Sequence, residues 1–109
     1  MSSKTTSRWH RMRTRESRDV ERVLRAEFPE TDAYRYNSAS IRVRVVDERF
    51  KGKDPEDRDA MVEPLLRKLP EQIQSDIMNL ITLYPGETDK SLKARLADTE
   101  FEDPSPSRL

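Results

Sequence analysis

The spacing of apolar residues along the chain predicts first a helix and then a pair of strands. Between residue 17 and Pro29, apolar side chains recur every three or four positions, as on the buried stripe of a helix. Between Ile41 and Val45, apolar residues alternate with arginines, which is typical of a strand with one buried and one exposed face. Residues 33–36 predict a preceding strand, and a turn at 37–40 would join the two as a hairpin.

A second helical region and a last strand follow. Asp54 and Pro55 form a favourable helix start, and apolar residues continue with a helical period to Leu69. Residues 77–84 are mostly apolar and predict a strand in the centre of the sheet. Sparse apolar residues after that strand predict a final helix.

These elements give an α+β fold class with the order α-β-β-α-α-β-α. The simplest packing places the helices on one face of a three-stranded sheet, so that they share a single core. The expected buried set is Val20, Leu24, Phe28, Ile41, Val43, Val45, Met61, Leu65, Leu69, Met78 and Leu80.

The distribution of charged residues divides the chain of 109 residues into a central region and two ends of different charge. Charged residues make up 39% of the chain and hydrophobic residues 33%, too polar a mixture for order throughout. Residues 1–16 are strongly basic and are expected to form a flexible arm, whereas residues 98–109 are expected to form an acidic disordered tail. The folded domain would then span residues 17–97. Ends of opposite charge can bind different partners, bind each other, or only aid solubility.

Residue counts narrow the function classes further. Basic and acidic residues number 21 each, so net charge alone indicates no partner. The absence of cysteine excludes disulfides and thiolate metal sites. No apolar run approaches the roughly 20 residues that span a bilayer, and the basic N-terminal residues lack the apolar region of a signal peptide. We therefore expect a cytoplasmic protein without a membrane partner.

The segment from Val45 to Lys53 resembles the BolA-like family of small α+β domains, which is similar in arrangement to type II KH domains. It matches that family's V-V-S-x-x-F-x-G-K pattern, where a strand runs into a short helix and a bend. Residues 58–62 stand where the family has R-H-R-L-V, and residues 75–80 where it has I-H-A-L-S-I. Residues 85–87 stand where it has T-P-E-E. The resemblance covers roughly residues 18–88 and implies a BolA-like or KH-like fold.

Histidine is missing at both positions that carry the metal chemistry of that family. The histidine of R-H-R is Asp59 here, and the one that ligates an iron–sulfur cluster shared with a monothiol glutaredoxin is Asp76. Carboxylates are poorly matched to such clusters, and the lone His10 lies outside the matched region. We expect no cofactor and no cluster, which puts a glutaredoxin-type partnership in doubt.

The first functional hypothesis is a small regulatory or nucleic-acid-binding module, with RNA or DNA as partner. Lysine and arginine hold phosphates, and an aromatic ring can stack on an unpaired base. The bend at residues 52–55 occupies the place of the KH-domain G-x-x-G clamp but lacks its second glycine. The candidate contact residues are Arg8, Trp9, Arg11, Arg13, Arg42, Arg44, Lys51 and Lys53.

Two alternatives stand beside that hypothesis. The strand arginines can instead be the solvated face of an amphipathic strand. The second functional hypothesis is a protein-interaction adaptor without nucleic-acid binding, in which an exposed sheet edge or a helix groove recruits the partner. No carboxylate is paired with a histidine or a glycine loop, and no serine lies in a nucleophile elbow, so we expect no enzymatic activity.

Overall fold

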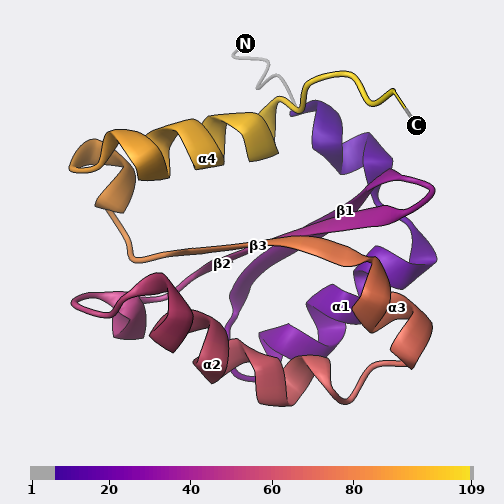
Figure 1. The fold of residues 1–109 in the computed structure, drawn as a ribbon, viewed down its shortest axis with the longest axis horizontal. Helices are drawn as coiled ribbons and strands as arrows, with labels where there is room; N and C mark the ends of the chain where they lie inside the picture. Colours follow the sequence, from indigo (N-terminus) through magenta and orange to yellow (C-terminus); the bar gives the residue numbers. More distant parts are fainter. Residues whose placement is uncertain (1–6, 109) are drawn as a thin grey trace, which may run out of the picture.

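The computed structural model describes residues 7–108, which fold around one three-stranded sheet (Figure 1). The predicted order α-β-β-α-α-β-α is confirmed, with three short 3-10 helices added. The elements are η1 (Arg8–Met12), α1 (Arg15–Arg25), β1 (Glu30–Asn37), β2 (Ser40–Val46), η2 (Glu48–Phe50), α2 (Pro55–Leu66), α3 (Glu71–Asp76), β3 (Ile77–Leu83), η3 (Glu87–Asp89) and α4 (Leu92–Glu102). Within residues 7–108, no helix is both long and apolar enough to cross a membrane.

The strands lie in the order β1-β2-β3, so β2 is central and β3 is at an edge. β1 pairs with β2 antiparallel, as the predicted hairpin requires, and β2 pairs with β3 parallel. The expectation that the last strand is central is therefore wrong. Apart from Met78, its apolar residues pack against helices on the two faces of the sheet, which gives a mostly apolar run without a second neighbouring strand.

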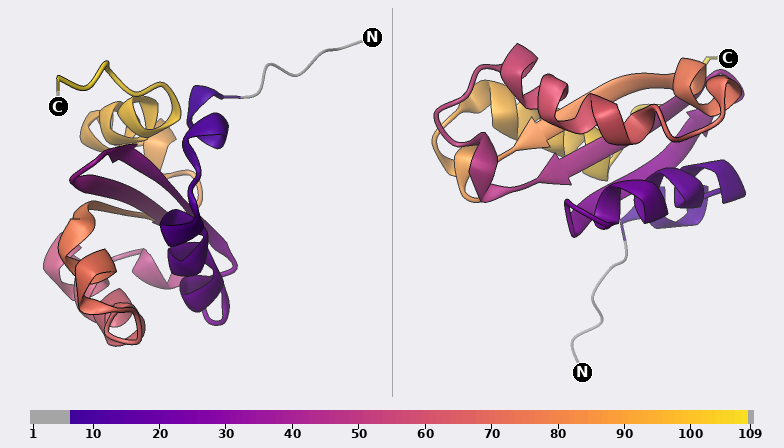
Figure 2. Two further views of the ribbon diagram at one scale, coloured as in Figure 1. Left: turned by 90° about the vertical axis from the view of Figure 1, so that its right-hand side faces the viewer. Right: turned by 90° about the horizontal axis from the view of Figure 1, so that it is seen from below.

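Helices cover both faces of the sheet, which corrects the expectation of packing on one face (Figures 1 and 2). α1, α2 and α3 lie on one side, and α4 and η1 lie on the other. The side chains of β2 explain the arrangement, because successive residues of a strand point to opposite faces. Ile41, Val43 and Val45 pack toward α1 and α2, while Arg42 and Arg44 point toward α4.

The larger core lies between the sheet and the first three helices. Val20 and Leu24 of α1, Val43 of β2 and Val62 of α2 are fully buried there. Most of the predicted buried residues belong to this core, with Met61 and Leu80 only partly buried. Met78 is the exception, since 69% of its surface is exposed.

A smaller second core lies between the sheet and α4. It contains Trp9, Tyr34, Ile81, Leu83, Ala94 and Phe101. Trp9 of η1 is only 2% exposed and Phe101 of α4 is fully buried. From residue 7 onward the predicted flexible arm is therefore part of the fold, and the predicted tail begins inside α4. Residues 1–6 and 109 lie outside the described residues.

Candidate functional site

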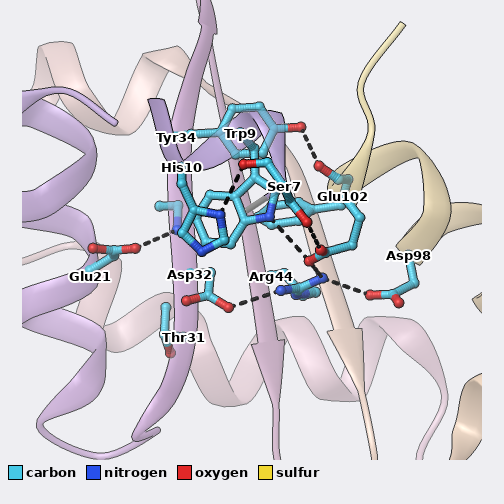
Figure 3. Close-up of polar contacts among 12 residues, drawn as sticks. Ser7, Trp9, His10, Glu21, Thr31, Asp32, Tyr34, Arg44, Asp98 and Glu102 are labelled. Atoms are coloured by element: carbon cyan, nitrogen blue, oxygen red, sulfur yellow. Dashed lines mark hydrogen bonds and ion pairs between the residues drawn. The ribbon is translucent and has the colours of Figure 1, made fainter. Parts of the chain in front are cut away.

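Trp9, the aromatic residue predicted to stack on a base, is held inside the second core. Its ring stacks on Tyr34 at a centroid distance of 5.8 Å and meets Phe101 at 5.3 Å. Its Nε1 donates a hydrogen bond to Glu102 Oε2 at 3.1 Å (Figure 3). Because both the ring and the N–H are engaged, no face of the indole is presented to a nucleic-acid base.

Arg44, predicted to contact phosphate, instead forms an ionic network with three carboxylates (Figure 3). Its guanidinium lies 2.9 Å from Asp32 of β1 and 2.9 Å from Asp98 of α4, and it also pairs with Glu102. Only 12% of the Arg44 side chain is exposed. Burial would raise the pKa of Glu102, but hydrogen bonds from Ser7 and Arg44 outweigh it and lower that pKa.

Arg42 is engaged with α4 in a similar way. Its Nη1 lies 3.0 Å from Glu100 Oε2, and its guanidinium stacks over the Tyr36 ring at 3.7 Å. The backbone N–H of Ser105 is the main cause that lowers the pKa of Glu100, and Arg42 adds to the same effect. The basic face of the sheet is thus neutralised by carboxylates that come from the C-terminal helix.

The predicted cations of the N-terminal segment are divided between contacts and solvent. Arg8 donates to the carbonyl of Pro104 and lies 4.0 Å from Asp103. Arg13 pairs with the buried Glu21 at 3.1 Å. The two oppositely charged ends of the chain therefore bind each other, one of the outcomes that their sequence allowed. Arg11 is exposed and has no ion pair among residues 7–108.

Lys51 and Lys53 lie in the bend after η2, at the other end of the molecule from η1 (Figure 1). Both side chains are exposed, and Lys51 lies 5.9 Å from the centroid of the Tyr84 ring. Gly52 between them has a φ of 79°, a left-handed conformation that favours glycine. The structure therefore does not gather the predicted nucleic-acid residues into one surface.

The two aspartates at the family histidine positions have different surroundings. Asp76 pairs with Arg35 of β1 at 2.9 Å and accepts a second hydrogen bond from Gln72. Asp59 has no cationic partner among the described residues, and burial together with the charges of Glu63 and Glu56 raises its pKa. No group of three or more histidine, cysteine or acidic residues within 7–108 is arranged to hold a metal ion.

A groove between α2, α3 and β3 borders Asp59, and sequence reasoning missed it. Its volume is about 350 Å³. We call it the edge groove; it is lined by Asp59, Glu63, Leu66, Arg67, Gln74, Ile77, Met78, Asn79 and Leu80. The sequence signal was present in the acidic residues of α2, spaced at three and four positions beside Leu66. Met78 lies in an apolar run that predicts a buried strand, so the sequence does not indicate a groove beside it.

The backbone of β3 gives this groove its chemical character. The N–H of Asp47 bonds to the carbonyl of Leu83, which shows that Leu83 faces β2. Since backbone groups alternate in direction along a strand, those of Leu80 and Thr82 point away from β2. Arg58 confirms this direction by donating to the Thr82 carbonyl at 2.9 Å. The outward groups of Leu80 pair with no other strand in the described part of the chain.

Comparisons with known proteins support the fold. No family model matches the chain, and no curated protein matches it. Among solved structures, BolA1 from Arabidopsis thaliana is similar, with a TM-score of 0.51 and 19% sequence identity. The match covers 68% of this chain and 96% of that one. The chain therefore has a BolA-like fold, as its sequence resemblance implied.

Proposed function

We propose that this protein is a non-catalytic protein-interaction module built on a BolA-like fold. One observation carries the proposal: α4 closes the basic face of the sheet. Arg42 and Arg44, which a KH-like module would present to phosphates, are held by Glu100, Asp98 and Glu102 of that helix. A nucleic acid would have to displace α4 and leave those carboxylates unpaired, at a cost of several kcal/mol.

The edge of β3 supports a protein as the partner. An edge strand offers a row of backbone donors and acceptors that another chain can pair with. Met78 adds a large exposed apolar side chain beside this edge. Apolar contact combined with backbone hydrogen bonding is a means of recognising a polypeptide, whereas phosphate recognition needs clustered cations.

The proposal includes no iron–sulfur cluster. Asp76 pairs with Arg35, a cation that is four-fifths buried, at 2.9 Å, and releasing Asp76 to a metal would leave Arg35 only the longer contact with Glu16 at 3.5 Å. Its oxygen donors are also hard ligands, unlike the imidazole and thiolate groups that hold such clusters. Partnership with a glutaredoxin, if it occurs, would have to rest on direct protein contacts.

The test uses the intact protein in two binding measurements. Fluorescence anisotropy with labelled single-stranded RNA, single-stranded DNA and duplex DNA, in low and physiological salt, measures nucleic-acid affinity. Affinity capture from nuclease-treated cell extract, followed by reconstitution with the purified partner, measures protein affinity. We expect a stoichiometric protein complex and only weak, salt-sensitive binding to all three nucleic acids.

A matched variant separates sheet binding from general charge attraction. Arg42→Gln removes a sheet cation, whereas Arg11→Gln removes an exposed cation of η1. If the protein binds the nucleic acids tightly, and Arg42→Gln lowers that affinity more than Arg11→Gln does, the sheet is a nucleic-acid-binding surface and the proposed function is wrong. A reconstituted complex that forms equally in nuclease-treated samples supports it.

A further inference from the structure

We infer that the edge of β3 binds an extended segment of the partner protein as a fourth strand, and that this segment carries a lysine or arginine next to an apolar residue. The inference rests on the proposed function and specifies its binding site and the chemistry of its partner. Three properties of the edge support it: its free backbone groups, its hollow flanks and its unpaired carboxylates.

The free backbone groups favour an extended segment rather than a helix. Leu80 directs both its N–H and its carbonyl away from β2, and Thr82 directs its N–H the same way. Arg58 already donates a hydrogen bond to the Thr82 carbonyl, so the row of backbone groups open to an added strand ends at this carbonyl. A helix has no spare backbone groups to satisfy this row, whereas an added strand pairs with it directly.

Hollows flank the edge on both faces of the sheet, as the alternating side chains of an added strand require. The edge groove lies on the α2 side. A second hollow of about 260 Å³ runs along the edge to α4: Pro55, Arg58 and Asp59 line its α2 end, and Lys93, Ala94 and Ala97 its α4 end. Asn79 and Leu80 line both hollows, so the strand itself separates them.

Unpaired carboxylates of α2 favour a cation of the partner at one place on this edge, whereas Arg67 and Lys93 line other parts of the two hollows. Glu56, Asp59 and Glu63 lie on one side of α2, and we call them the acidic ridge. None of the three has an ion pair with another residue in the described chain, although carboxylates of β1 and α4 are paired. Like charges at this spacing repel one another, and a cation of the partner next to Asp59 and Glu63 would relieve the repulsion.

The same ridge argues against a second copy of this chain as the occupant. Two β3 edges that pair antiparallel about a two-fold axis normal to the sheet keep their helices on the same face. The two acidic ridges would then face each other across the new strand pair. Like charges placed opposite one another are destabilising, so a basic segment of a different protein fits the edge better.

The experiment selects peptides and then maps their binding site. A phage-displayed library of random linear peptides is selected against the intact protein, and enriched peptides are titrated into the isotope-labelled protein by NMR. We expect peptides with a basic residue next to an apolar one and no central proline, and we expect amide shifts concentrated at residues 78–82. Placing proline at the centre of a selected peptide should abolish binding, because it removes a ladder donor.

Matched charge variants test the acidic ridge. Combined Asp59→Lys and Glu63→Lys substitutions should weaken a selected peptide about tenfold or more. Asp57→Lys, on the same helix but outside the edge groove, should change affinity less than threefold or so. Met78→Glu provides a second test that does not threaten folding, because Met78 is exposed.

The inference is overturned if no peptide is enriched, if the amide shifts lie away from β3, or if the Asp59 and Glu63 substitutions leave affinity unchanged. Sedimentation that shows a dimer which Met78→Glu dissociates would also overturn it, in favour of a second copy. A reconstituted partner that binds the substituted protein normally would defeat this inference and leave the proposed function standing.

Discussion

Arg44 of β2 and Asp98 of α4 lie 2.9 Å apart and join two elements that are 54 positions apart in the chain. The same guanidinium holds Asp32 of β1 and Glu102 of α4. It therefore ties two strands of the sheet to the helix that covers them. The basic face of β2, which in sequence predicts phosphate binding, therefore lies beneath α4 and borders the second core.

Removing the Arg44 side chain should release α4 from the sheet. Arg44→Ala leaves three neighbouring carboxylates without their shared cation, and we expect a loss of about 2–3 kcal/mol in the free energy of unfolding. Arg22→Ala is the control, because Arg22 is exposed and, within residues 7–108, forms an ion pair with Asp19 alone; its cost should be no more than about 0.5 kcal/mol. Urea denaturation measures both, and equal losses would show that Arg44 has no special structural role.

Truncating Phe101 tests whether the second core stabilises the fold. Phe101 is fully buried against Trp9 and Tyr34, so Phe101→Ala should cost roughly 3–5 kcal/mol. Leu96→Ala on the same helix removes a largely exposed side chain and should cost less than about 1 kcal/mol. Thermal unfolding followed by circular dichroism compares the two, and a Phe101→Ala protein as stable as Leu96→Ala would place α4 outside the cooperative fold.

Acid should lower the stability that the packing of α4 on the sheet provides. The pKa of Glu102 is lower in the folded protein than its usual value of 4.5, since hydrogen bonds from Ser7 and Arg44 outweigh the effect of burial. The stabilisation is therefore complete above pH 4.5 and is lost as the pH falls through the folded pKa. Urea denaturation between neutral and acid pH should show this loss, and Glu102→Gln should reduce it. An unchanged acid dependence in Glu102→Gln would contradict the assignment.

Asp59 should show the opposite dependence. Burial and the charges of Glu63 and Glu56 raise its pKa above the usual 3.8, so its ionised form opposes folding at neutral pH. Asp59→Asn should stabilise the protein at pH 7 by up to about 0.5 kcal/mol, with the gain vanishing below pH 3.8. The same variant should bind a basic peptide more weakly. Stabilisation without loss of peptide affinity would show that the carboxylate has no binding role.

The central sheet and its first three helices could be predicted from the sequence because their signals are local. Apolar residues alternate with arginines from Ile41 to Val45, and they recur at helical spacing from Val20 to Phe28. Each pattern indicates, within a single element, which residues are buried. The BolA-like fold was implied by the resemblance of residues 45–53, 58–62 and 75–80 to the motifs of that family. Met78 was misassigned because an apolar run does not reveal whether a strand has one neighbour or two.

The layer formed by η1 and α4 could not be predicted in the same way, because its signals are not local. Trp9 and Glu102 are 93 positions apart, and neither flanking segment has enough apolar residues to indicate burial. In the structure, the basic N-terminal segment pairs with the acidic C-terminal segment. Their opposite charges are visible in the sequence, but charge alone does not show whether the two segments are in contact.

The central claim is that the N-terminal segment and α4 close the basic face of the sheet, and the fluorescence of Trp9 tests it most directly. The chain has a single tryptophan, so its emission reports on that layer alone. At neutral pH the account predicts blue-shifted emission that iodide and acrylamide quench poorly, and a red shift in Arg44→Ala. Emission of the native protein like that of free tryptophan, with full quenching, would contradict the account and return Trp9 to a flexible basic arm able to bind nucleic acid.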